Sequence, residues 1–236
     1  MTDFSKDVGS MARSGIREVF DLALTLPNCI HLETGEPNFP TPSYISKAAS
    51  EAVLAGHTGY TPNAGIPELR DAIADSMNKK GVASTRDHVT ITPGGVAAAN
   101  SAFKALTNPG DGVLLADPSW PNFRMMADLH GLETQYFATH AKDGFVPKAE
   151  HVERAITSKS KLLVLNSPSN PTGAMIPEDE LGNLIQLARD ADLWVMADEV
   201  YDMIVFEGSQ VSAGTRNEDG RVILIYSFSK TYAMTG

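Results

Sequence analysis

Two side chains in the second half of the chain could together bind a flat, charged heterocycle. Asp198 and Lys230 each follow a very apolar run, which is typical of a strand covered on both faces of a sheet. A carboxylate in such a position is costly unless a positive group compensates its charge. A partly desolvated lysine has a lowered pKa and becomes a candidate nucleophile. A lone lysine is more often a solvated surface residue, so the prediction depends on what accompanies it.

Further groups follow other apolar runs and complement this pair. The turn Gly94-Gly95-Val96 opens a helix, where backbone N–H groups and the helix dipole favour a phosphate. Trp120 could stack on a flat ring. Asn170 lies in a loop dense in Asn and Pro that aims an amide into the cleft, and Tyr201 adds a phenol. Each group alone has an ordinary explanation as a turn or as packing.

In chain order these segments supply a phosphate cradle, an aromatic ring, an amide, a carboxylate, a phenol and an amine. Pyridoxal phosphate suits this set, because its aldehyde requires an amine and its ring nitrogen a carboxylate. The glycine fingerprints of nicotinamide and P-loop nucleotide sites do not occur, nor does the His-Glu-x-x-His of zinc enzymes. The six histidines stand singly, so no metal site is expected.

Composition limits the class of protein. The 236 residues can bury a substantial core, and 42% of them are hydrophobic, as in globular proteins. The formal net charge of -10 argues against a nucleic acid or an anionic membrane as partner, since both require a basic face. Cys29 is the only cysteine, no signal peptide is visible, and no apolar run reaches membrane-spanning length. These features indicate a cytoplasmic protein.

Short apolar runs alternate with helical stretches, which predicts an α/β fold with a doubly wound, mostly parallel sheet flanked by helices. Six strands are expected: Val89–Thr92, Val113–Ala116, Thr134–Phe137, Leu162–Asn166, Leu193–Ala197 and Val222–Tyr226. Helices are expected over Val8–Leu24, Thr41–Leu54, Pro67–Met77, Val96–Leu106, Lys148–Ile156 and Glu178–Arg189. Ligands of such a sheet bind at the carboxyl ends of its strands, where the candidate side chains lie.

The motifs closely resemble those of the class I/II pyridoxal-phosphate aminotransferases, the aspartate aminotransferase-like branch of fold type I. The resemblance runs from about Thr34 to Gly236. It is carried by Gly35–Pro42, Tyr60–Arg70, Asn166–Gly173, Asp198–Tyr201 and Ser227–Lys230. Asn-Pro-Thr-Gly, Asp-Glu-x-Tyr and Ser-x-Ser-Lys in this order form a highly specific combination. The resemblance implies transamination between an L-amino acid and a 2-oxo acid.

By position, the resemblance implies a catalytic role for three residues. Lys230 looks like the lysine that forms the internal aldimine and later moves the substrate's Cα proton. Asp198 resembles the carboxylate that pairs with the pyridine nitrogen, which keeps that nitrogen protonated. Tyr201 looks like a donor to the phenolic oxygen of the ring, and Asn170 resembles a second donor to the same oxygen.

Other residues are implied to bind the cofactor or the substrate. Trp120 matches the ring-stacking aromatic, and the Gly94-Gly95-Val96 turn matches the phosphate cup. The hydroxyls of Ser227 and Ser229 are expected to add to that cup. Gly35 matches a residue that lines the substrate-carboxylate site, together with Trp120 and Asn170.

The resemblance also implies an assembly and a division into domains. Tyr60 resembles a tyrosine that reaches the phosphate of the neighbouring subunit's cofactor, so a homodimer is expected. Residues 1–40 are expected to form an N-terminal arm and part of a small domain, and residues 41–236 the cofactor-binding large domain. Family members continue beyond the lysine motif into another strand and a small domain. The large domain is therefore expected to be incomplete, and the C-terminal small domain absent.

Three alternatives remain at this point. The same scaffold serves other pyridoxal-phosphate reactions, such as a C–S lyase or a ring-forming synthase. A truncated, inactive fragment would keep the recognition elements without completing the site. An effector domain of a transcription regulator would require a DNA-binding domain ahead of Gly35, where only about 35 residues stand.

Overall fold

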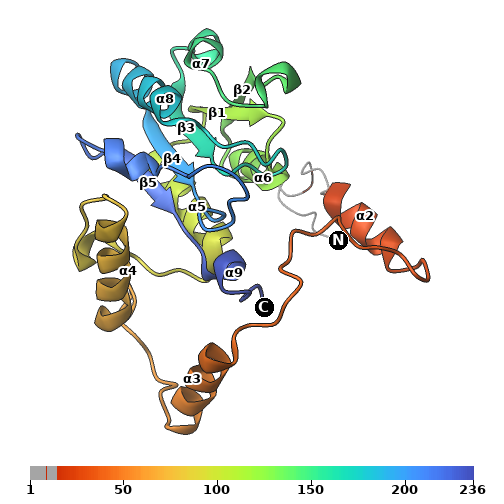
Figure 1. Cartoon of the computed structure of the whole chain (residues 1–236). Coiled ribbons are helices and arrows are strands. Elements are labelled where there is room, and N and C mark those ends of the chain that lie inside the picture. Colours follow the sequence, from red (N-terminus) through yellow and green to blue (C-terminus); the bar gives the residue numbers. More distant parts are fainter. Residues whose placement is uncertain (1–8, 10–14) are drawn as a thin grey trace, which may run out of the picture.

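Five parallel strands form the centre of the computed structural model, which describes residue 9 and residues 15–236 (Figure 1). In chain order they are β1 (Gly112–Asp117), β2 (Glu133–Ala138), β3 (Ser160–Asn166), β4 (Trp194–Asp198) and β5 (Val222–Ile225). Their spatial order is β2-β1-β3-β4-β5, and every neighbouring pair is parallel. All five carboxyl ends therefore lie at one edge of the sheet, as a doubly wound fold requires.

Helices cover both faces of this sheet (Figure 1). One face packs against α7 (Ala149–Ala155), α8 (Glu178–Asp190) and the short helix η3 (Ala213–Arg216). The other face packs against α5 (Gly94–Leu106) and α6 (Pro121–Leu129). Because both faces are covered, the inner strands are continuously apolar, and the α/β prediction is confirmed.

The expected strand over Val89–Thr92 is wrong. This segment belongs to no sheet among the described residues, although it is extended. Its backbone bonds to the preceding part of the chain: Ile91 N donates to Ala64 O at 2.9 Å, and Arg70 Nε donates to Val89 O at 2.9 Å. A strand exists only where a second strand pairs with it. Strand β5 is an edge of the sheet, and the segment Val89–Thr92 does not pair with it.

Helix α6 was not expected from the sequence. It begins at Pro121, and proline suits the first helical position because its missing N–H would have no partner there. Its buried residues Phe123, Met126 and Ala127 show the helical spacing that carries the signal. The helix bridges β1 and β2, so the crossover between these parallel strands follows the usual pattern.

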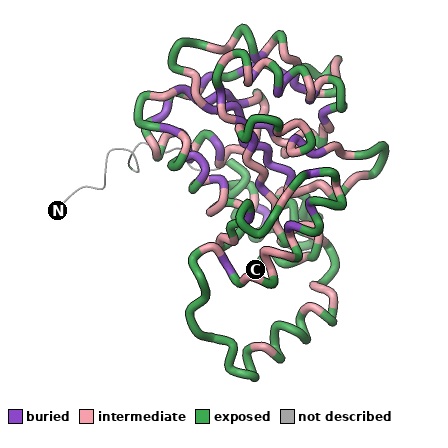
Figure 2. The backbone as a smooth tube through the Cα atoms, turned by 90° about the vertical axis from the view of Figure 1, so that its left-hand side faces the viewer, coloured by how far each residue is buried: buried purple, intermediate pink, exposed green. Residues whose placement is uncertain are grey.

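The first third of the described chain stands away from the sheet. It contains α2 (Gly15–Ala23), α3 (Ser43–Leu54) and α4 (Pro67–Lys79). Helix α3 has no buried residue, and Figure 2 shows the exposed class along most of the part that protrudes from the sheet. Part of the expected helix over Val8–Leu24 lies outside the described residues. No helix in residues 15–236 is long and apolar enough to cross a membrane.

The start of α3 differs in detail from the expected one. Pro42 occupies the capping position, and no side chain caps the helix. Thr41, where the helix was expected to begin, lies before it, and its hydroxyl donates to the carbonyl oxygen of Ala233. The hydroxyl thereby ties the N-terminal segment to the turn that follows the lysine motif.

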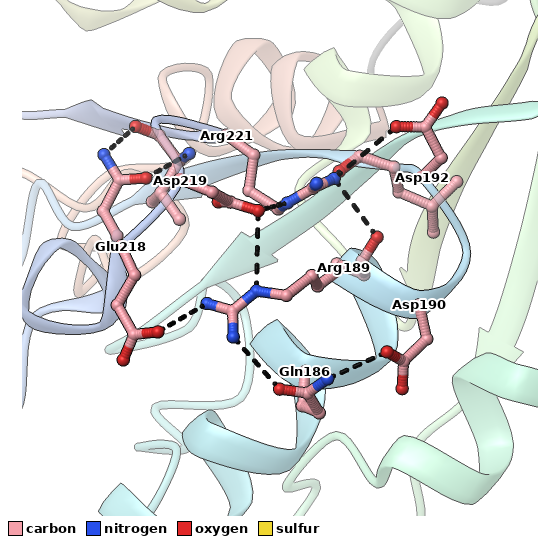
Figure 3. A network of polar contacts seen from close by, with 11 residues as sticks. Gln186, Arg189, Asp190, Asp192, Glu218, Asp219 and Arg221 are labelled. Atoms are coloured by element: carbon pink, nitrogen blue, oxygen red, sulfur yellow. Dashed lines mark hydrogen bonds and ion pairs between the residues drawn. The ribbon is translucent and has the colours of Figure 1, made fainter.

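A network of charged side chains joins the end of α8 to the start of β5 (Figure 3). Arg221 Nε pairs with Asp219 at 2.6 Å, and Arg221 Nη1 donates to Leu193 O at 2.8 Å. Arg189, in the last turn of α8, pairs with Glu218 at 3.2 Å and with Asp219 at 3.5 Å. These contacts fix the amino ends of β4 and β5, opposite the edge where the candidate side chains gather.

Candidate active site

A buried carboxylate lies at the carboxyl end of β4. Asp198 is 5% exposed, and within the described part of the chain its carboxylate accepts one hydrogen bond, from Val200 N to Oδ1 at 3.2 Å. No cation pairs with it among the described residues. Burial raises the pKa of the Asp198 carboxyl to about 6, and the charge of Glu199 adds to the rise. A positive group bound beside Asp198 would lower this energetic cost.

The amine of Lys230 lies at the carboxyl end of the neighbouring strand. It belongs to α9 (Phe228–Thr231), which Ser227 caps by accepting a hydrogen bond from Ser229 N at 3.2 Å. Lys230 Nζ donates to Gly35 O at 2.5 Å and lies 5.7 Å from the centre of the Tyr201 ring. Burial lowers the pKa of the Lys230 ammonium, against the opposing charge of Glu36. A lowered pKa increases the fraction of neutral, nucleophilic amine.

Tyr201 neighbours both the carboxylate and the amine. Burial and the charge of Asp198 raise the pKa of its phenol, while a hydrogen bond with Asn170 opposes the rise. The Tyr201 hydroxyl would lie 3.5 Å from a Cβ placed on Gly35, so Gly35 and Tyr201 are close neighbours. The structure thus brings Asp198, Tyr201, Asn170, Lys230 and Gly35 together, although they come from distant parts of the chain.

Asn166 positions the loop that carries Asn170, and the sequence analysis gave it no role of its own. Its Oδ1 accepts from Asn170 N at 2.7 Å, and its Nδ2 donates to Asp198 O at 3.0 Å. One amide therefore connects the ends of β3 and β4 to the loop. The signal in the sequence was its place as the last residue of a buried strand, before a loop rich in Asn and Pro.

The start of α5 faces the same edge. Gly94 has a φ of +82°, a conformation that L side chains rarely adopt, and no atom lies within 4 Å of a Cβ built there. A Cβ on Gly95 would lie 3.7 Å from Ser227 Cβ, so the first turn of α5 lies beside the cap of α9. Val96 follows and is 50% exposed. The first N–H groups of a helix have no partner within it, which suits this turn to an anion.

The remaining predicted residues take different positions. Trp120 directly precedes α6, and its ring packs edge-on against Phe123 with the centres 5.2 Å apart. The Ser227 hydroxyl donates to Ser229 Oγ at 2.9 Å, so both hydroxyls lie at the start of α9. Tyr60 is fully exposed in the connection between α3 and α4, and among the described residues no hydrogen bond joins it to the other site residues.

These features fit pyridoxal phosphate. A buried carboxylate that pairs with no cation suits the ring nitrogen, the open space at Gly94 suits a phosphate, and the amine of Lys230 suits the aldehyde. Within residues 15–236 no group of three His, Cys, Asp or Glu side chains could hold a metal ion. The carboxylate, the anion-binding turn and the amine together are the donor set of an organic cofactor with an anionic and a cationic end.

Comparison with known proteins gives the family. The family profile described as aminotransferase class I and II matches residues 27–236. The chain is 37% identical over 241 residues to the aspartate/prephenate aminotransferase of Thermus thermophilus, covering 100% of this chain and 62% of that protein. It is 38% identical over 224 residues to a probable aspartate aminotransferase of Methanocaldococcus jannaschii, covering 94% of this chain and 58% of that protein.

A solved structure agrees with the sequence comparison. The aspartate aminotransferase of T. thermophilus with maleate superposes with a TM-score of 0.95 at 36% identity, covering 100% of this chain and 63% of that one. The chain thus spans somewhat less than two thirds of the length of these relatives. On this likeness of sequence and of fold, the chain belongs to the aminotransferases of class I and II, fold type I enzymes whose cofactor is pyridoxal phosphate.

Proposed function

We propose that this chain forms the cofactor-binding part of an enzyme that transfers an amino group between an L-amino acid and a 2-oxo acid. The observation that carries the proposal is that Asp198, Asn170 and Lys230 all lie near Tyr201. Bound pyridoxal phosphate supplies an aldehyde that condenses with amines and a ring that accepts electrons. The protein's residues then decide where the cofactor lies and which proton moves.

Each residue has a proposed role in that task. Asp198 holds the proton on the ring nitrogen, because a buried carboxylate is stabilised by a cation beside it. The hydroxyl of Tyr201 and the amide of Asn170 donate to the phenolic oxygen of the ring. Lys230 would hold the cofactor at its aldehyde, and its amine would accept the proton from the substrate's Cα.

The phosphate and the substrate contact other groups. The backbone of the Gly94-Gly95-Val96 turn and the hydroxyls of Ser227 and Ser229 hold the phosphate. Trp120 stacks on the ring of the cofactor. Its own indole ring packs edge-on against Phe123, which restricts the orientation of the indole. Gly35 lines the site of the substrate's carboxylate, together with Trp120 and Asn170.

The organisation of the protein is part of the proposal. We assign residues 1–40, of which 1–8 and 10–14 lie outside the described part of the chain, to an arm and part of a small domain, and residues 41–236 to an incomplete large domain. Tyr60 reaches the phosphate in the partner subunit of a homodimer, which is consistent with its full exposure. The lone Cys29 is in keeping with a cytoplasmic location.

Covalent trapping tests the proposal. The intact protein is incubated with pyridoxal phosphate, treated with borohydride, digested and analysed by mass spectrometry. We expect the reduced cofactor on Lys230, and neither this adduct nor the visible absorbance band in Lys230→Ala. Lys47→Ala, which removes an exposed lysine of α3, serves as the matched control and should retain both. A wild-type protein labelled only at other lysines would contradict the role of Lys230.

An activity assay separates transamination from the alternatives. We expect formation of a 2-oxo acid from an amino acid donor, with a second oxo acid as acceptor. Release of pyruvate and ammonia from a cysteine-type substrate would indicate a C–S lyase instead. Absence of cofactor binding would indicate an inactive fragment.

A further inference from the structure

Glu199, next to Asp198, is a buried carboxylate for which the proposed chemistry has no use. Its side chain is 2% exposed, among the most buried in the protein. No cation pairs with it among the described residues, since the nearby ammonium of Lys80 pairs with Asp202. Burial raises the pKa of the Glu199 carboxyl. Such a group is costly to retain, so its hydrogen-bond partners indicate what it does.

The partners of Glu199 come from two separate segments. Its Oε1 accepts from Ala213 N at 2.7 Å, at the start of η3. Its Oε2 accepts a short hydrogen bond from the hydroxyl of Tyr226, which also lies 3.3 Å from Ser212 Oγ. Lys80 Nζ lies 4.8 Å from the centre of the Tyr226 ring. Tyr226 is thus held at its hydroxyl by Glu199 and at its ring by the ammonium of Lys80.

Glu199 and Tyr226 lie on the opposite face of the sheet from the cofactor-binding groups. Side chains alternate between faces along a strand: Ala197 packs toward α8 and Met196 toward α5. Continued alternation directs Asp198 toward the α5 face and Glu199 toward η3. Along β5, Ile225 packs toward α5, so Tyr226 points toward η3, and Ser227 lies beside Gly95 of α5.

The pair therefore connects the two backbone segments that carry the chemistry. Glu199 directly follows Asp198, and its N–H donates to Ile225 O at 2.9 Å, the last ladder contact between β4 and β5. Beyond that contact, no strand pairing joins the segment that follows β4 to the segment that follows β5. The hydrogen bond between Glu199 and Tyr226 joins these two segments just beyond the end of the strands. Tyr226 stands one residue before Ser227 and four before Lys230.

We propose that Glu199, through its hydrogen bond to Tyr226, is a positioning residue that sets the distance between Asp198 and the turn carrying Lys230. The inference rests on the proposed function, because the distance matters only if one ligand contacts both side chains. A buried polar pair is a poor way to gain stability, since apolar residues of the same shape can replace both members at little cost. Its directional bond, unlike apolar packing, fixes one arrangement of the two segments.

Four variants of the intact protein test this role: Glu199→Gln, Glu199→Leu, Tyr226→Phe and the double variant Glu199→Leu/Tyr226→Phe. Each is measured twice, by urea unfolding without cofactor and by fluorescence titration with pyridoxal phosphate. The amide of Glu199→Gln can still accept from Ala213 N and donate to the Tyr226 oxygen, so the bridge persists. We expect its dissociation constant for the cofactor to stay within about threefold of wild type.

Both single variants leave buried polar groups without their partners: Glu199→Leu removes the acceptor of Ala213 N and of the Tyr226 hydroxyl, and Tyr226→Phe removes the donor to Glu199 Oε2. We expect both to lose stability and to bind the cofactor at least about tenfold more weakly, the scale known for groups that orient metal ligands. In the double variant the carboxylate and the phenol hydroxyl are both gone and only Ala213 N stays without its acceptor, so stability should return part of the way from Glu199→Leu toward wild type while the cofactor affinity stays reduced. If the pair only stabilised the fold, the cofactor affinity of the double variant would recover together with its stability.

Two results would overturn the inference. One is a wild-type dissociation constant in the double variant, and the other is a Glu199→Gln variant as weak as Glu199→Leu. If the double variant does not fold, the contrast between Glu199→Gln and Tyr226→Phe carries the same test. Failure of the proposed function itself appears separately, as a wild-type protein in which borohydride does not label Lys230.

Discussion

The burial of Asp198 makes the stability of the cofactor-free chain depend on pH. The pKa of its carboxyl rises from 3.8 to about 6, so the folded chain binds more protons than the unfolded chain between these values. The contribution to stability is therefore fully present below about pH 4 and is lost as the pH rises through 6. A shift of this size corresponds to about 3 kcal/mol.

The substitution Asp198→Asn tests this dependence. An amide cannot ionise. Between pH 4 and pH 8 the free energy of unfolding of wild type should therefore fall by up to about 3 kcal/mol more than that of the variant. Urea unfolding of the cofactor-free proteins at both pH values measures the difference. Asp117→Asn is the matched control, because Asp117 also ends a strand of the sheet but is exposed. Equal pH dependence in wild type and Asp198→Asn would contradict the burial argument.

Individual functional residues could be predicted where their type was unusual for their place. A carboxylate or a lysine directly after a run of apolar residues is such a case, and it made Asp198 and Lys230 candidates. Asn166 and Glu199 were missed as positioning residues, because their importance lies in partners distant in sequence. The hydrogen bond of Glu199 to Tyr226 joins residues 27 positions apart, and no local pattern records it.

At the scale of elements, the sheet could be predicted better than its edges. The inner strands are continuously apolar because helices cover both faces, and that pattern is visible in one sequence. The strand expected over Val89–Thr92 failed because pairing depends on a neighbour, which composition does not show. Helix α6 was overlooked although Pro121 marks its start.

The charged network at the amino end of β5 is expected to hold α8 in place (Figure 3). Removing Arg221 takes away its ion pair with Asp219 and leaves the carbonyl oxygen of Leu193 without this donor. We expect Arg221→Ala to lower the free energy of unfolding by about 2 kcal/mol, since bonds to a charged group are the stronger ones. Thermal or urea unfolding measures the change.

A weaker pair at the same end of the sheet provides the control for Arg221. Lys161 pairs with Asp192 at 3.7 Å, and both side chains are well exposed. Exposed pairs contribute little, so Lys161→Ala should change stability by less than about 1 kcal/mol. Equal effects of the two substitutions would show that the network adds nothing beyond ordinary surface charge.

For the molecule as a whole, the main feature is the amount of apolar surface outside the sheet domain. Leu22, Leu24, Tyr44, Leu54 and Tyr60 are all exposed, and they lie in or near α2 and α3. Figure 2 shows the exposed class along most of that region. Many exposed apolar side chains in one region of a chain are typical of a surface that associates. This is consistent with the proposed homodimer in which Tyr60 completes the partner's site.

Mixed dimers test that assembly. Tyr60→Ala and Lys230→Ala each damage every site in a homodimer, so both proteins alone should bind the cofactor weakly. After subunit exchange, each hybrid has one site with an intact Lys230 and an intact Tyr60 from the other subunit. In an equal mixture we expect about one quarter of all sites to regain wild-type affinity, measured by titration. No recovery in a mixture shown to exchange subunits would contradict a shared site.

The bond between Lys230 and Gly35 has a consequence for the order in which the molecule is made. It joins residues 195 positions apart, and a ribosome builds the chain from the N-terminus. Gly35 therefore emerges early, and the amine follows only after all five strands have been synthesised. A nascent chain therefore holds the residues of all five strands before the amine that joins their edge has been translated.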